Sequence, residues 1–260
     1  MRLQFASDLH LNSWTPPRES REKPVAFEDI LVPVAKNLVL CGDIGHPDSI
    51  MLHLFFKWAA KRWTTIFWIP GHHEMTDAWH LQNRTYDECL YHMRSIVSEY
   101  ENIHVLHRES FVTDDGFLLL GCPLWNRLTA LSYENAADPI MKDITKHYEE
   151  DLKWLKAQIK KSDLPIVIVS YYPPTQTLMD PNVINKPLSV TMAIETELLL
   201  KAPVVAWVCG YLHRAIQIEK TWLDIGGDTS KTLIAINPRG YPGELTGYRT
   251  DAVLRLEKPK

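Results

Sequence analysis

The 260-residue chain is 45% hydrophobic and 23% charged, which is the composition of a folded globular protein and excludes a disordered chain. Its net charge of −4 gives no basic footprint and disfavours non-specific binding of nucleic acid. Apolar stretches all stay below the roughly 18 residues that a transmembrane helix needs, so we expect no membrane partner.

Short apolar or β-branched runs alternate with longer helical patterns along the chain. We expect strands at residues 3–7, 38–41, 65–69, 103–106, 117–121, 166–170, 204–209, 215–219, 232–236 and 252–256. Apolar residues at helical spacing predict helices over residues 47–63, 86–100, 144–160 and 191–200. This alternation predicts an α/β protein with largely parallel strands, whereas the stretch from about residue 207 predicts hairpins.

The two most loop-like stretches, residues 14–24 and 128–143, are too short to separate domains, so we expect residues 1–260 to form a single domain. The first strand begins almost at the first residue, which leaves no room for a signal peptide. Four cysteines lack C-x-x-C spacing and are predicted to be reduced thiols: Cys41, Cys89, Cys122 and Cys209. We therefore expect a cytoplasmic location.

Three of the predicted strands are followed at once by acidic and histidine side chains. The motifs are Asp8-Leu-His10, Gly-Asp43 and Gly-His72-His73-Glu74. Ligands bind at the carboxyl ends of strands in open α/β sheets, and side chains two residues apart in an extended segment point the same way. Carboxylates combined with imidazoles suit a divalent ion such as Mn, Fe or Zn.

The order of these motifs resembles that of the calcineurin-like metallophosphoesterases, and the match runs nearly end to end. A later strand followed by Tyr171 and a final Gly-Tyr211-Leu-His213 continue the order, and the segments Leu-Gly-Cys-Pro-Leu-Trp125 and Asn-Pro-Arg239-Gly-Tyr-Pro resemble a small, single-domain, bacterial-type branch. The resemblance implies a four-layer fold, in which two mixed β-sheets form a sandwich flanked by helices. It also implies a binuclear metal site among the loops.

The resemblance assigns one metal to Asp8, His10, Asp43 and His213, and all four residues are present. The second metal shares Asp43, but its three other ligand positions carry different residues. These positions hold His72, Tyr171 (with Tyr172 as the alternative alignment) and Tyr211.

A neutral tyrosine binds a divalent ion poorly. Its phenol must ionise to become a good ligand, and its pKa is about 10. Two tyrosines are also bulky enough to occupy the volume of the ion. We therefore expect one ion and favour loss of the second over a remodelled iron–tyrosinate site. His72 keeps the ability to bind a metal, and hydrogen bonding to Asp43 is its alternative role.

By resemblance, the reaction is hydrolysis of a phosphomonoester or phosphodiester by metal-activated water. His73 is implied to protonate the leaving oxygen, with Glu74 orienting it. Arg239 has two readings, as a phosphate contact or as a structural salt bridge. The substrate class is then a phosphorylated small molecule or a phosphodiester.

Two hypotheses of function follow. The intact first site and the His73–Glu74 pair favour a phosphoesterase that works with a single ion and weakened activity. The clustering of three changes on one ion favours a catalytically impaired pseudo-phosphoesterase, which serves as a binding or structural module with a protein partner.

Overall fold

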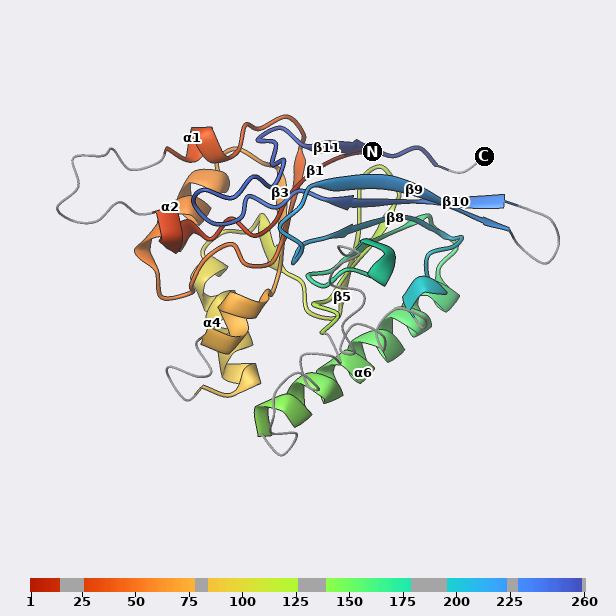
Figure 1. The fold of residues 1–260 in the computed structure, drawn as a ribbon, viewed down its shortest axis with the longest axis horizontal. Coiled ribbons are helices and arrows are strands. Elements are labelled where there is room, and N and C mark those ends of the chain that lie inside the picture. Colours follow the sequence, from red (N-terminus) through yellow and green to blue (C-terminus); the bar gives the residue numbers. More distant parts are fainter. Residues whose placement is uncertain (15–25, 78–83, 126–138, 179–195, 224–228, 259–260) are drawn as a thin grey trace.

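Parallel pairing of strands dominates the computed structural model (Figure 1), which describes residues 1–14, 26–77, 84–125, 139–178, 196–223 and 229–258. Runs such as Ile-Val-Ile-Val in the seventh strand are apolar throughout, which is typical of strands that are buried on both faces. The strands form two sheets, and antiparallel partners lie only at their edges.

The first sheet has five strands in the order β11-β1-β2-β3-β4. The central strands run parallel, and β11 pairs antiparallel with β1 at one edge. The bounds are β1 Arg2–Ala6, β2 Asn37–Cys41, β3 Thr65–Ile69, β4 Ile103–Val105 and β11 Val253–Arg255.

The second sheet has six strands in the order β5-β6-β7-β8-β10-β9. Its four inner strands run parallel, and β5 and β9 are antiparallel edges. The bounds are β5 Glu109–Val112, β6 Leu118–Gly121, β7 Ile166–Val169, β8 Val204–Cys209, β9 Ile216–Leu223 and β10 Thr229–Ile236. One hydrophobic core includes buried side chains from both sheets.

Helices lie outside the sheets, with α1, α2 and α4 on the left and the long α6 along the lower side, below the strands of the second sheet (Figure 1). Thr85 and Glu88 form a reciprocal capping box that starts α4. The helices are α1 Phe27–Ile30, α2 Ile50–Ala59, α4 Tyr86–Val97 and α6 Pro139–Lys161, with short turns η1 Leu11–Trp14, η2 His73–Asp77 and η3 Gln176–Leu178.

The observed elements confirm the predicted α/β sandwich with two mixed sheets and helices. All ten predicted strands are present, but β5 was missed and β9 extends to Leu223. The predicted loop 128–143 ends earlier, because α6 begins at Pro139, and its residues 128–138 lie outside the described residues. Most of the predicted helix 191–200 also lies outside them.

The four cysteines are buried, and each is a free thiol. Across the described residues, none of the helices combines the length and apolarity needed to cross a bilayer.

Candidate metal centre

Backbone hydrogen bonds join the loops that follow the strands of both sheets. The Asp8 N–H donates to the Gly42 carbonyl over 2.9 Å, which connects the ends of β1 and β2. A parallel bridge between Ser7 and Pro238 connects the end of β1 to the end of β10 in the other sheet. The motifs therefore meet at the carboxyl ends of the strands, where α/β proteins bind ligands.

The backbone at this edge is strained. Asp8, His10 and Asp43 have φ of 49°, 43° and 53°, and Tyr211 has φ of 69°. Residues other than glycine seldom adopt this left-handed region, and strain of this kind clusters at functional sites. Three of the four residues are predicted ligands of the first metal.

Asp8, His10 and His213 each offer one ligand atom, and these atoms lie within 4.8 Å of one another. The Nε2 atoms of His10 and His213 are 3.3 Å apart, and His213 Nε2 lies 3.7 Å from Asp8 Oδ1. Atoms about 2.0–2.2 Å from one ion are separated by roughly 3–4 Å. The three side chains therefore converge as ligands of a single ion do.

Asp8 is fully buried, and in the described part of the chain neither of its carboxylate oxygens has a donor in good hydrogen-bonding geometry. The Ser7 hydroxyl and the Tyr211 N–H lie near enough to lower the pKa of Asp8, but burial and the charge of Asp43 outweigh them. A buried carboxylate without donors is costly unless a cation compensates it. The donors available here, one carboxylate with two imidazoles, fit a divalent transition metal. The metal that the resemblance implies would thus be the partner that the Asp8 carboxylate lacks.

Asp43 is also buried, but both of its oxygens accept hydrogen bonds. The backbone N–H of His73 donates to Oδ1 over 2.8 Å, and the hydroxyl of Tyr171 donates to Oδ2 over 2.6 Å. Burial, followed by the charge of Asp43, holds the pKa of Tyr171 well above its ordinary value, so the phenol stays neutral. Tyr171 is therefore a hydrogen-bond donor to Asp43.

The other two tyrosines lie next to Tyr171. The ring centroid of Tyr211 is 5.7 Å from that of Tyr171 and 4.5 Å from that of Tyr172. Tyr172 is buried and directs its ring toward Trp125 and Tyr211. Of the two tyrosines considered for the fourth motif, Tyr171 is thus the one that faces Asp43.

Glu74 has backbone partners in the loop that presents Asp43. Its carboxylate accepts hydrogen bonds from the backbone N–H groups of Asp43, Ile44 and Gly71, over 2.8, 2.6 and 2.9 Å. Glu74 therefore holds this loop, while an orienting role toward the His73 imidazole stays a prediction. The Glu74 side chain is fully buried, and burial raises its pKa to about 8, with a further contribution from the charge of Asp43.

Gly71 allows this arrangement of the Asp43 loop. A Cβ at this position would overlap the backbone nitrogen of Asp43 and lie 2.6 Å from Glu74 Oε2. Only glycine leaves room for the two backbones to approach this closely.

The two histidines after β3 lie at different places relative to the candidate ligands. His73 joins His10 and Asp43 in a second group of ligand atoms within 4.8 Å, and its Nε2 is 3.8 Å from Asp43 Oδ2. His72 is half-buried and belongs to neither group. The structure thus brings His73 to the site and leaves His72, which was predicted as a ligand, outside the convergent set.

Two residues of the tail segment, residues 237–244, contact the site, and neither was predicted as a site residue from the sequence. Tyr241 places its hydroxyl 2.8 Å from His73 Nε2 and stacks on the His10 ring at a centroid distance of 4.1 Å. Glu244 Oε2 lies 2.6 Å from His213 Nδ1. Tyr241 stood within a segment that had been singled out, whereas Glu244 carried no signal because its contact is 31 residues away in the chain.

Arg239 is half-buried, and burial lowers its pKa to about 10. Tyr248 and Asp29 lie close enough to raise this pKa in part, and the backbone N–H of Arg239 donates to the Ser7 carbonyl. Its role, as a phosphate contact or as a structural salt bridge, stays a prediction.

Three buried carboxyl groups, those of Asp8, Asp43 and Glu74, share this small region. Burial and the charge of Asp43 raise the pKa of Asp8 as they raise that of Glu74. The basic side chains paired with Asp8 and Asp43 within the described ranges are the imidazoles of His213 and His73, which carry a charge only when protonated. A divalent cation would supply the positive charge that this cluster needs.

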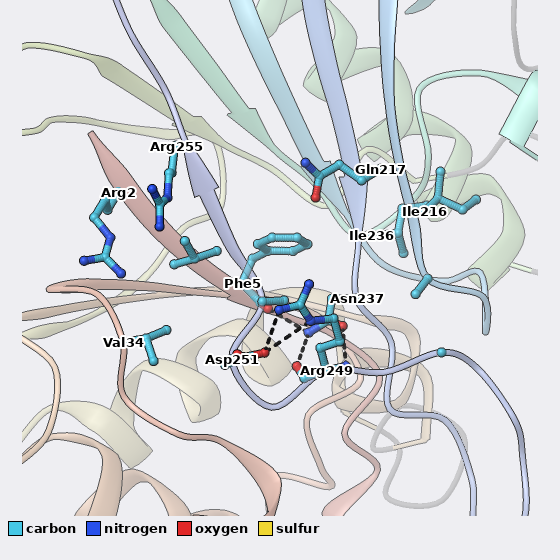
Figure 2. Close-up of a pocket in the computed structure, with 14 residues that line it drawn as sticks. Arg2, Phe5, Val34, Ile216, Gln217, Ile236, Asn237, Arg249, Asp251 and Arg255 are labelled. Atoms are coloured by element: carbon cyan, nitrogen blue, oxygen red, sulfur yellow. Dashed lines mark hydrogen bonds and ion pairs between the residues drawn. The ribbon is translucent and has the colours of Figure 1, made fainter.

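A separate hollow of about 500 Å³ opens between β1 and β11 on one side and β9 and β10 on the other. Figure 2 shows Arg2 and Arg255 together on one side of it and Phe5 between them and Ile236, and Arg249 pairs with Asp251 at 3.1 Å. Its lining contains none of the predicted metal ligands. The convergent ligands therefore lie outside this hollow.

Residues 1–214 match the model of the calcineurin-like phosphoesterase family. The chain is 22% identical over 246 residues to the uncharacterized protein L509 of Acanthamoeba polyphaga mimivirus, with 85% of this chain and 84% of that protein covered. It is also similar to the crystal structure of phosphopantetheinyl hydrolase from Mycobacterium tuberculosis, with a TM-score of 0.57, 14% identity and coverage of 92% and 89% of the two chains. At this identity, the structural likeness shows the fold alone.

Proposed function

Because the chain belongs to the calcineurin-like phosphoesterase family, we propose that it is a metal-dependent phosphoesterase that uses one divalent ion. Asp8, His10 and His213, which converge, would hold this ion together with Asp43, which lies in the second group around His10 and His73 and is assigned to the same ion by the resemblance. The observation that carries the proposal is Asp8, a buried carboxylate whose oxygens have no donor in good hydrogen-bonding geometry in the described residues and which faces two converging imidazoles. A cation is the simplest partner for such a set.

The restriction to one ion rests on Tyr171. In the binuclear arrangement that the resemblance implies, Asp43 is shared by both ions, but here one of its oxygens accepts a hydrogen bond from Tyr171. The phenol is neutral and buried, so it competes with a second ion for Asp43 and offers no anionic ligand in exchange. Tyr211 packs beside Tyr171 and adds bulk at the same place.

A bound divalent ion supplies charge neutralisation for the phosphoryl group and lowers the pKa of water. The chain's own residues supply the rest. Asp8, His10 and His213 would hold the ion, and so set where a phosphate bound to it would lie, and His73 Nε2, directed toward the same space, would pass a proton to the leaving oxygen. We expect the substrate to be a small phosphomonoester or phosphodiester.

The same tyrosine contact favours a second candidate, a pseudo-phosphoesterase that binds one ion or ligand without turnover. Loss of one of two ions removes part of the electrostatic stabilisation of the transition state, which is usually among the largest catalytic contributions. Measurement of turnover separates the two candidates.

The first experiment measures hydrolysis of p-nitrophenyl phosphate and bis(p-nitrophenyl) phosphate with added Mn²⁺. We expect turnover that Asp8→Asn lowers by about 100-fold or more, because the ligand set loses its charged member. Asp115→Asn, which changes an exposed aspartate in the turn between β5 and β6, is the matched control and keeps wild-type activity. Equal rates in the wild type and Asp8→Asn would contradict the proposal.

A second experiment restores the second site with Tyr171→His, Tyr211→His and His72→Asn together. We expect this variant to bind a second ion and to hydrolyse the diester faster than the wild type does. Absence of turnover both in the wild type and in the restored variant would favour the pseudo-phosphoesterase.

A further inference from the structure

The tail segment that follows β10 contacts all three histidines of the metal centre. Tyr241 contacts His10 and His73, and Glu244 contacts His213. The segment is fixed to the ligand loop by its backbone, since the Gly240 N–H donates to the Asp8 carbonyl over 2.9 Å. One short segment therefore touches every imidazole that surrounds the candidate ion.

Glu244 determines which nitrogen of His213 is available to a metal. An ionised carboxylate only accepts hydrogen bonds, so its 2.6 Å contact with Nδ1 places the imidazole proton on Nδ1. The Nε2 lone pair is then left facing His10 Nε2 and Asp8 Oδ1. A carboxylate behind a metal-binding imidazole orients the ring and increases its basicity.

Tyr241 acts on the other two imidazoles. Its ring lies nearly parallel to that of His10, with 17° between the planes, and its hydroxyl contacts His73 Nε2. Its backbone N–H donates to Glu244 Oε2 over 2.9 Å, so the two tail residues support each other. His73 Nε2, the atom proposed to deliver the proton, is thus held by a hydroxyl from the tail.

We propose that Glu244 and Tyr241 are positioning residues of the metal centre, with Glu244 setting the affinity of His213 for the ion and Tyr241 holding the His73 imidazole. The proposal rests on the proposed function only for the role of His73 as a proton donor. The tests of both residues measure Mn²⁺ affinity and histidine resonances, and they need no substrate.

The test for Glu244 is a Mn²⁺ titration of the metal-free protein by isothermal calorimetry. Glu244→Ala is expected to weaken Mn²⁺ binding about 10- to 100-fold, as loss of such outer partners does. Glu244→Gln keeps an oxygen acceptor and recovers part of that loss. The control is Glu219→Gln, which removes an exposed carboxylate on β9 that pairs with Lys231 on β10. We expect it to bind Mn²⁺ as the wild type does. Wild-type affinity in Glu244→Ala would overturn the assignment.

The test for Tyr241 is the imidazole nitrogen spectrum of the metal-free protein by NMR. Tyr241→Phe keeps the ring on His10 and removes the hydroxyl, so we expect the His73 resonances to shift while Mn²⁺ affinity stays within about twofold. Tyr91→Phe, at an exposed position on α4, is the control and shifts no resonance of His73. Unchanged His73 resonances in Tyr241→Phe would overturn the assignment, whether or not the protein hydrolyses phosphoesters.

Discussion

Asp8 combines three unfavourable features in one residue: full burial, carboxylate oxygens without a donor in good hydrogen-bonding geometry within the described chain, and a φ of 49°. Backbone strain of this kind costs about 1–3 kcal/mol, and a buried carboxylate adds to it. Residues selected for stability alone avoid such costs, so Asp8 is the residue at which the demands of a site override those of folding.

We expect Asp8→Asn to stabilise the metal-free protein. Because folding raises the pKa of Asp8, the wild type loses stability as the pH rises above the ordinary pKa of 3.8, and asparagine removes that loss. We expect a gain of about 0.5–2 kcal/mol at pH 7, measured by urea unfolding in the presence of a chelator. A less stable Asp8→Asn protein at pH 7 would count against the interpretation of Asp8.

The convergence of Asp8, His10 and His213 could be predicted because each stands in a short motif that follows an apolar strand. The contacts that support these residues could not be predicted. Glu74 reaches back 31 residues to the Asp43 N–H, and Tyr241 contacts His73 across 168 residues. Such contacts depend on how the loops of two sheets meet, which local pattern and spacing do not encode.

Among the elements, the inner strands were predicted well because their residues are apolar throughout. The edge strand β5 was missed because its burial alternates, and only four residues, Glu-Ser-Phe-Val, carry the pattern. The loop between β2 and α2 is the element that presents Asp43, and its shape depends on Gly71 in the neighbouring loop.

That dependence predicts that Gly71→Ala destabilises the protein by about 1–3 kcal/mol, the usual cost of overpacking. The new methyl group would press on Asp43 and Glu74. Gly45→Ala, in the Asp43 loop, meets only ordinary contacts of 3.4 Å or more and is the matched control. Urea unfolding measures both variants, and equal stability of the two would refute this account of the loop.

A contact between α4 and the residues that follow β4 predicts that the stability of the protein depends on pH. Trp125 Nε1–H donates to the Tyr86 hydroxyl, which lies 2.9 Å from His107 Nε2 and can donate its own proton to that nitrogen. Burial, followed by the charge of Arg108, lowers the pKa of His107 from 6.5 to about 3. The folded protein therefore binds fewer protons than the unfolded chain between these values.

Stability should accordingly fall as the pH drops below 6.5, approaching about 1.4 kcal/mol per pH unit for this one proton. His107→Gln removes the titrating group and keeps an acceptor. We expect its unfolding free energy to lack this component between pH 6.5 and 5 when both proteins are unfolded in urea. Parallel pH profiles of the two proteins would contradict the prediction.

At the scale of the whole molecule, two mostly parallel sheets bring their carboxyl ends together, and a bridge between Ser7 and Pro238 joins them there. One consequence is that Asp8 and His10, which follow β1, meet His213, which follows β8 in the other sheet. A metal bound at this junction stabilises the folded state by mass action, about 2.7 kcal/mol at 100 times its dissociation constant.

The central claim, one ion held by Asp8, His10, Asp43 and His213, is tested most directly by the number of Mn²⁺ ions that the protein binds at equilibrium. Calorimetric titration of the metal-free protein should give one ion per chain in the wild type and none in Asp8→Asn, with Asp115→Asn unchanged. Two ions per chain in the wild type, or one retained in Asp8→Asn, would contradict the account.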